Sequence, residues 1–136
     1  MKAFYIGSSF RNIEQVRLVA KALIREGFIH SYDWTRLESV QSVDELVTIG
    51  EHEKEAIIGS DFIIFILPLG KSSHVELGIA LASPKPVYLY SQTDELYTLD
   101  HTSSFYHLKG IDRFVGPFDE FLDHLLKKLN IFSKKH

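Results

Sequence analysis

Residues 62–67 form an unbroken apolar run, Phe-Ile-Ile-Phe-Ile-Leu. Successive side chains of a strand point to opposite faces of its sheet, so a strand with one face in water alternates apolar and polar residues. An unbroken apolar run is instead typical of a central strand in a parallel sheet, which is buried on both faces. Such a strand requires helices on both sides of the sheet. Residues 62–67 therefore limit the possible folds of the chain more than any other segment does.

Strand and helix patterns alternate along the chain. Besides 62–67, short runs rich in β-branched and aromatic residues predict strands at 3–6, 28–32, 87–90 and 113–115. Apolar residues at helical spacing predict helices at 12–26, 42–59, from 73 onward and at 118–129, with a short helix near 94–96. We therefore expect an α/β fold, a single doubly wound (flavodoxin-like) domain with a five-stranded parallel sheet and helices on both faces. The domain is expected to span residues 1–132, with a basic tail at 133–136.

The composition argues against several classes of function. Cysteine is absent, so the chain has neither thiol catalysis nor disulfides, which suits a reducing compartment. With 15 Lys and Arg against 18 Asp and Glu, the net charge of -3 argues against nucleic acid as a partner. The longest apolar stretch, 62–69, is far shorter than a membrane span, and residues 1–7 do not resemble a signal peptide. We therefore expect a cytoplasmic protein that binds neither membrane nor nucleic acid.

The loops that follow the strands are the expected place for a ligand. In open α/β sheets, ligands bind at the carboxyl ends of the strands, near the point where the strand order reverses. Three predicted loops should meet there, at 7–12, 33–35 and 67–76. Their small, polar and aromatic residues are the candidates for binding substrate: Gly7, Ser8, Ser9, Arg11, Asp33, Trp34, Gly70, Ser72 and Ser73.

Familiar cofactor and metal motifs do not match this sequence. Gly70-Lys71-Ser72 ends like a phosphate-binding P-loop, but the position of the required earlier glycine holds Phe65. The segment after the first strand lacks the later glycines of a dinucleotide fingerprint. His52-Glu53 has no second histidine at metalloprotease spacing, because position 56 is Ala56. We therefore expect neither a metal nor a cofactor.

Glu76 is open to two interpretations. It lies early in a helix that begins at the carboxyl end of a strand, where a carboxylate can attack or stabilise an oxocarbenium-like sugar carbon. Alternatively, it is a helix cap, because Ser73 and Glu76 match the capping-box pattern. The same pattern occurs at two other predicted helix starts, at 12–15 and 42–45. Spacing alone does not decide between a catalytic and a capping carboxylate.

The surroundings of Glu76 resemble the nucleoside 2-deoxyribosyltransferase family, which includes the 2′-deoxynucleoside 5′-phosphate N-hydrolases. The resemblance rests on Ser60-Asp61, the apolar strand, a glycine-bearing loop and then His74-Val75-Glu76-Leu77-Gly78-Ile79-Ala80-Leu81. Tyr5-Ile6-Gly7-Ser8-Ser9-Phe10-Arg11 is similar to the family's first strand and loop, and the likeness extends to about Tyr90.

This resemblance implies roles for several residues. Glu76 would be the nucleophile that attacks the anomeric carbon and forms a covalent glycosyl-enzyme, and Tyr5 would position it. Glu53 stands where the family carries an aspartate and would be the second acidic group. Gly70 stands where the family often has Asp or Ser, and a serine at 72 or 73 would supply the hydroxyl instead. No cofactor is needed, because two carboxylates supply the acid and base chemistry.

Two further groups are candidates for binding the rest of a substrate. Ser8, Ser9 and Arg11 lie at a predicted helix start, where backbone N–H groups and the helix dipole favour an anion. Arg11 resembles the phosphate-side arginine of the monophosphate hydrolases; the alternative is ordinary capping and solvated charge. Asp33 and Trp34 are suited to enclose a nucleobase, with the Trp34 ring stacked on it. The alternative is that Trp34 is an aromatic residue of the core or of an interface.

The leading hypothesis is N-glycosidic bond cleavage or transfer on a (deoxy)nucleoside or nucleoside 5′-monophosphate. Two alternatives stay open: a non-catalytic nucleotide-binding or sensing module, and a related NAD-type glycohydrolase. We also expect a homodimer or larger homo-oligomer, with aromatic residues of the 91–110 region near a neighbour's pocket.

Overall fold

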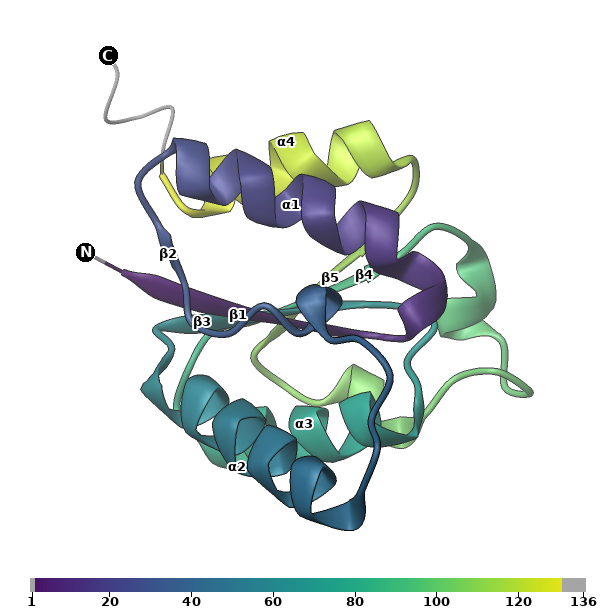
Figure 1. The fold of residues 1–136 in the computed structure, drawn as a ribbon. Coiled ribbons are helices and arrows are strands. Elements are labelled where there is room, and N and C mark those ends of the chain that lie inside the picture. The colour runs from purple at the N-terminus through teal and green to yellow at the C-terminus, as the bar shows by residue number, and fades with distance from the viewer. Residues whose placement is uncertain (1, 131–136) are drawn as a thin grey trace.

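The structure, a computed structural model, describes residues 2–130, so the predicted boundary at 132 and the tail at 133–136 lie outside the described residues. Within this range five strands and four α-helices alternate (Figure 1): β1 (Ala3–Ser8), α1 (Ile13–Arg25), β2 (Ile29–His30), α2 (Val43–Gly59), β3 (Phe62–Ile66), α3 (Lys71–Ala82), β4 (Val87–Ser91), β5 (Ile111–Val115) and α4 (Phe118–Lys128). The connections hold short 3₁₀ helices: η1 (Phe10–Asn12), η2 (Trp34–Arg36), η3 (Asp94–Tyr97) and η4 (Ser104–His107). No helix in the described range is long and apolar enough to cross a membrane.

The strands form one parallel sheet in the order β2-β1-β3-β4-β5. Strand β3 is central, and all its residues are at most 2% exposed, as the apolar run predicts. Helices α1 and α4 cover one face of the sheet, while α2 and α3 cover the other (Figure 1). The predicted doubly wound α/β fold is therefore confirmed.

The strand order reverses between β1 and β3. The chain leaves β1 through α1 on one face and leaves β3 through α3 on the other. At the carboxyl edge the two strands still run side by side, with Gly7 paired to Phe65 and Ser8 paired to Ile66. A crevice opens at such a reversal point, because the connections on its two sides diverge. The residues that follow β1 and β3 line it.

The second strand is shorter than predicted, spanning Ile29–His30 rather than 28–32. Gly27 ends α1 with a positive φ of 96°, and the Phe28 N–H donates to the Leu23 carbonyl (3.0 Å). Phe28 therefore still belongs to the end of the helix. Beyond β2 the chain turns into η2, which the sequence did not predict.

Helix α3 begins at Lys71 rather than at 73. Gly70 is its N-cap residue, and Ser73 Oγ accepts a hydrogen bond from the Gly70 N–H (2.6 Å). The capping-box interpretation of Ser73 with Glu76 is therefore wrong, because Glu76 is the sixth residue of the helix and lies beyond its capping turn. Its carboxylate is free for another role.

The other two predicted capping boxes differ from each other. Ser42 Oγ accepts a hydrogen bond from the Glu45 N–H (3.1 Å), so Ser42 caps α2, but the Glu45 carboxylate accepts from the Gln41 N–H (2.7 Å) rather than from the Ser42 N–H. Asn12 makes no side-chain capping bond, and that prediction is wrong. Its amide instead donates to Ser8 Oγ (2.9 Å) and to the Pro68 carbonyl (3.1 Å), which ties the segment after β1 to the loop after β3.

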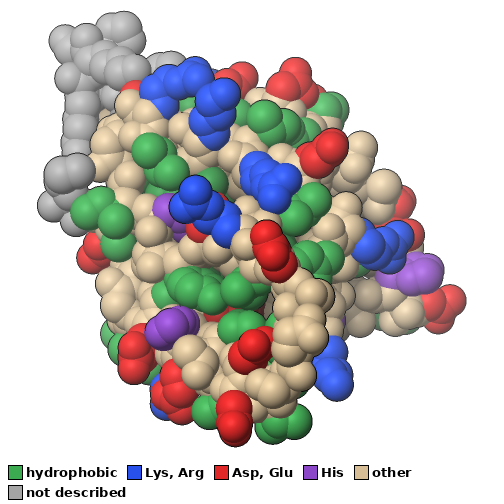
Figure 2. Space-filling model, viewed as in Figure 1, with side chains coloured by type: hydrophobic (Ala, Val, Ile, Leu, Met, Phe, Trp, Pro, Cys, Tyr) green, Lys and Arg blue, Asp and Glu red, His purple; other side chains and the backbone are tan. Residues whose placement is uncertain are grey.

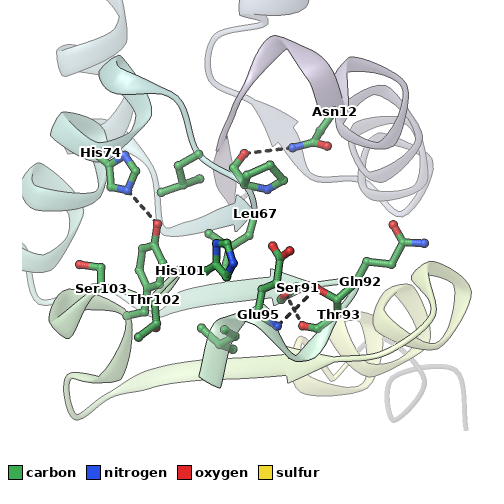
Figure 3. Close-up of a pocket in the computed structure, with 14 residues that line it drawn as sticks. Asn12, Leu67, His74, Ser91, Gln92, Thr93, Glu95, His101, Thr102 and Ser103 are labelled. Atoms are coloured by element: carbon green, nitrogen blue, oxygen red, sulfur yellow. Dashed lines mark hydrogen bonds between the residues drawn. The ribbon is translucent and has the colours of Figure 1, made fainter. Parts of the chain in front are cut away.

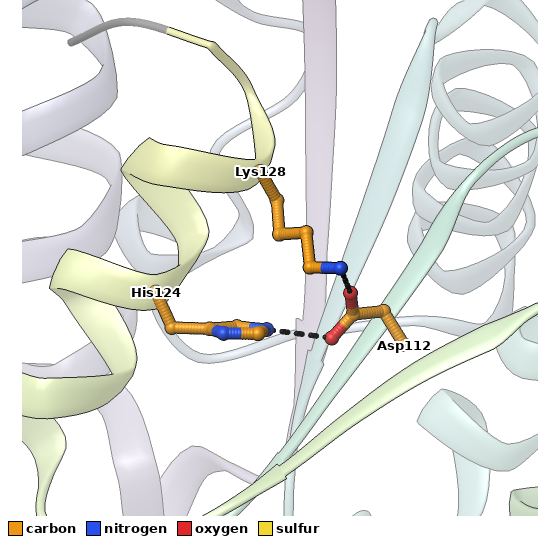
Figure 4. Close-up of polar contacts among 3 residues, drawn as sticks. All are labelled: Asp112, His124 and Lys128. Carbon is orange, nitrogen blue, oxygen red and sulfur yellow. Dashed lines mark hydrogen bonds and ion pairs between the residues drawn. The ribbon is translucent and has the colours of Figure 1, made fainter.

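The last strand begins at Ile111 rather than at 113. Asp112 on this strand accepts a hydrogen bond from His124 Nε2 (2.7 Å) and pairs with Lys128 Nζ (3.4 Å), both from α4 (Figure 4). These contacts attach the last helix to the edge of the sheet.

Candidate active site

A cavity of about 530 Å³ lies at the reversal point between β1 and β3. Its floor is formed by the carboxyl end of β1 and the first turns of α3, and its walls come from residues 34–40 and α2. Six of the predicted substrate-binding residues and both predicted catalytic glutamates line it: Ser8, Ser9, Trp34, Gly70, Ser72, Ser73, Glu53 and Glu76. The fold therefore brings together residues that are up to 68 positions apart (from 8 to 76).

Glu76 comes close to the backbone of β1. Its side chain is buried, and the residue is 7% exposed. Gly7 provides the space: a Cβ atom at this position would lie 3.1 Å from Glu76 Oε1 and 2.5 Å from Cε1 of the Phe65 ring. Gly7 therefore acts through its lack of a side chain, which lets the carboxylate sit beside the strand.

Tyr5 and Glu53 surround the Glu76 carboxylate. Tyr5 is fully buried on β1, and its hydroxyl donates a hydrogen bond to Glu53 Oε2 (3.3 Å) from α2. Burial, and then the negative charges of Glu76 and Glu53, raise the pKa of Tyr5 well above its usual value, so the hydroxyl stays a donor. The three groups share one network at the floor of the cavity.

Glu76 binds its proton unusually tightly. Burial and then the charge of Glu53 raise the pKa of Glu76 to about 8, although a hydrogen bond from Tyr5 acts in the opposite direction. Two carboxyl groups that face each other in a partly dry site cannot both ionise easily. The pair of carboxyl groups therefore holds one proton near neutral pH.

We expect this proton to make stability depend on pH. Because the pKa of Glu76 is raised on folding, its stabilisation is fully present below the ordinary value of 4.5 and is lost as the pH rises through about 8. In the Glu76→Gln variant the side chain stays neutral, so its melting temperature should fall less over this range. Thermal denaturation of both proteins from about pH 5 to pH 9 measures this, and parallel curves would contradict it.

Three predicted substrate-binding residues do not line the cavity: Arg11, Asp33 and Gly7, which lies against Glu76. Arg11 is exposed. The Asp33 carboxylate accepts hydrogen bonds from the backbone N–H and hydroxyl of Thr35, so it holds η2 together. Trp34 is both a core and a lining residue: it is 4% exposed, and its Nε1 donates to the Ile6 carbonyl (2.6 Å).

Part of the wall was missed by sequence reasoning. Phe10 contacts Trp34 edge to face, with ring centroids 5.2 Å apart, and Leu46 and Ile49 face the cavity from α2. Glu38 lines it from the segment after η2. A weak signal was available in α2, because Leu46, Ile49 and Glu53 are spaced to share one helix face.

A second cavity, of about 320 Å³, lies beyond the 67–70 loop (Figure 3). His74 lines it and bonds to Tyr106 through Nε2 (2.7 Å), while its Nδ1 lies 2.9 Å from the Gly70 carbonyl. Asn12 lies on the other side of the loop, bonded to Pro68. The loop that precedes α3 is therefore held from both sides.

No protein-family model matches the chain, and no curated protein matches its sequence. Among solved structures, it is similar to the Clostridium botulinum CMP N-glycosidase BcmB (TM-score 0.65, 16% identity, covering 91% of this chain and 98% of that one). It is also similar to a conserved protein from Enterococcus faecalis V583 (TM-score 0.61, 11% identity, 94% and 99% covered). The chain shares their fold. The structural likeness therefore extends past Tyr90, where the sequence resemblance ends.

Proposed function

We propose that this protein breaks or transfers the N-glycosidic bond of a (deoxy)nucleoside or nucleoside 5′-monophosphate, with Glu76 as the nucleophile. The observation that carries the proposal is the buried Glu76 carboxylate at the floor of a cavity, beside a second carboxylate and a tyrosine hydroxyl. Most enzymes that cleave glycosidic bonds use two carboxyl groups. The name of one solved structure with the same fold, a CMP N-glycosidase, supports the same bond class.

The reaction follows from the positions of these groups. Ionised Glu76 attacks the anomeric carbon while the bond to the base nitrogen breaks and its electron pair leaves with the base. The single proton of the carboxyl pair lies on Glu53 when Glu76 attacks, and Glu53 passes it to the departing base. Water then attacks the anomeric carbon of the glycosyl-enzyme, Glu53 takes up its proton, and Glu76 is released. A second base in place of water gives transfer. The Tyr5 hydroxyl donates to Glu53, which holds that carboxyl group in place, and it also interacts with Glu76.

Incubation of the purified protein with a panel of nucleosides, their 5′-monophosphates and NAD, followed by chromatography of free bases, tests the proposal. Release of base from a nucleoside or monophosphate supports it. Release only from NAD favours the NAD-type glycohydrolase, and saturable binding without release favours a nucleotide-binding module.

A 5′-phosphate is expected to strengthen binding. The N-terminal turn of α3 and the Lys71 ammonium line the cavity, and both favour an anion. Because Lys71 lines the cavity and Arg11 does not, Lys71→Ala should remove most of an expected gain of about tenfold, and Arg11→Ala should remove less. Calorimetry with a nucleoside and its monophosphate compares the three proteins. Equal affinities of the wild-type protein for both ligands would contradict the prediction.

We also propose that the protein forms a homodimer or larger homo-oligomer through the 91–110 region. Tyr97 and Phe105 are each 59% exposed and Leu99 is 93% exposed, which suits an interface. Tyr106 is not available for this role, because it is buried against His74. Light scattering over a concentration series tests the assembly, and a constant mass of 15.6 kDa would contradict it.

A further inference from the structure

The end of the cavity formed by η2, the segment after it and the first turns of α2 has a mostly apolar lining. Phe10 and Trp34 line the cavity from the segments after β1 and β2, and Leu46 and Ile49 line it from α2. Glu53 lies seven positions after Leu46 on this helix, which at about 1.5 Å per residue places them roughly 10 Å apart along its axis. This length accommodates a planar base that extends from a sugar held at Glu76. The apolar walls and the two aromatic rings suit the faces of such a base.

Hydrogen-bonding side chains are scarce at this end. Among the described residues of the lining there, Trp34 and Glu38 carry the polar side-chain groups, and Trp34 Nε1 already donates to the Ile6 carbonyl. An ionised carboxylate accepts hydrogen bonds but donates none. Glu38 therefore offers acceptors and no donor to the edge of a base.

The charge of the surrounding surface also favours hydrogen-bond donors over acceptors at this end of the cavity. Helix α2 carries five acidic residues and a single cation, Lys54, which pairs with Glu51 at 3.6 Å. Figure 2 shows acidic side chains gathered over α2, whereas Lys and Arg lie mostly over α1. The cation that lines the cavity, Lys71, comes from the start of α3. A base edge that reaches Glu38 thus enters a region of negative potential.

We infer that Glu38 selects bases that carry an exocyclic amino group on the edge remote from the sugar, as adenine and cytosine do. The amino group at the outer end of such a base donates to the carboxylate. Hypoxanthine and uracil place a keto oxygen, an acceptor, at that position, and their donor, the ring N–H, lies one atom away along the same edge. The inference rests on the proposed function, because it assumes that the sugar lies at Glu76. It makes Glu38 a specificity-determining residue that takes no part in bond cleavage.

Matched substrate pairs test the inference. Adenosine and inosine, or cytidine and uridine, differ in the exocyclic group, amino or keto, and in the adjacent ring nitrogen, which is bare in the amino member and carries a hydrogen in the keto member. We expect wild-type kcat/KM to favour the amino member of each pair by about tenfold or more. Glu38→Gln should bring the ratio close to one, because an amide both donates and accepts. Glu55→Gln is the matched control, since Glu55 is exposed on α2 outside the cavity lining and its loss should leave the ratio unchanged.

Binding separates this inference from the proposed function. Calorimetry on Glu76→Gln with AMP and IMP measures preference without turnover, and tighter binding of AMP supports the role of Glu38 even if no base is released. If base release depends on Glu76 but kcat/KM is equal for the two members of each pair, the inference about Glu38 is overturned and the proposed function stands. An amino preference that persists in Glu38→Gln also overturns it. If neither AMP nor IMP binds, both the inference about Glu38 and the proposed function are overturned.

Discussion

Replacing Glu76 with glutamine is expected to reduce base release by at least about 10³-fold, because an amide cannot serve as the nucleophile. The fold should survive, since glutamine has nearly the shape of the protonated acid that burial already favours. Initial rates of base release measure the loss. A purified, folded Glu76→Gln protein with turnover within about tenfold of wild type would contradict the catalytic role.

The structure offers a control and a second measurement for this prediction. Glu55→Gln makes the same chemical change at an exposed site on α2 and should retain full activity. If the glycosyl-enzyme forms, intact mass of wild-type protein quenched during turnover should show an added glycosyl group on the 15.6 kDa chain. The modified peptide should contain residue 76, and Glu76→Gln should show no adduct.

Replacing Gly7 with alanine is expected to damage both stability and activity. The new methyl group would lie 2.5 Å and 2.7 Å from two ring atoms of Phe65, and 3.1 Å from Glu76 Oε1. Phe65 is fully buried in the central strand and has no room to move, so we expect a loss of about 1–3 kcal/mol of unfolding free energy. Any shift of the Glu76 carboxylate should lower the rate of base release by a further factor of about 10².

Gly78→Ala is the matched control. A Cβ atom at Gly78 meets nothing within 4 Å, and the residue lies inside α3. Alanine there should stabilise the protein by about 0.5–1 kcal/mol, because glycine is the weaker helix former. Chemical denaturation of both variants measures the contrast. Equal stability of Gly7→Ala and wild type would show that the strand and the carboxylate are not packed as tightly as described.

The sequence predicted the parts of the fold and site that follow from local pattern. The apolar run at 62–67 implied a central parallel strand, and parallel strands bring their carboxyl ends to one edge. For this reason Ser8, Ser9, Gly70 and Glu76 could be expected to lie together before their contacts were known.

Other features depend on packing that a sequence does not display. Ser73 with Glu76 fits a capping box as well as a catalytic carboxylate, and only the helix start at Lys71 excludes the first. Arg11 and Asp33 have suitable chemistry, but the turns η1 and η2 direct them to other positions. The lining role of Glu38 depends on how the segment after η2 passes α2, which no local pattern encodes.

The first turns of α2 are exposed to solvent, which affects how such a chain can diverge in sequence. Val43 and Val47 are 73% and 58% exposed, although Leu46 between them faces the cavity. Substitutions at exposed positions usually change stability little, whereas the floor beneath Glu76 is embedded in the core. Mutations can therefore accumulate in this wall. Under the proposed function, they would change the preferred base while the groups around Glu76 keep the same chemistry.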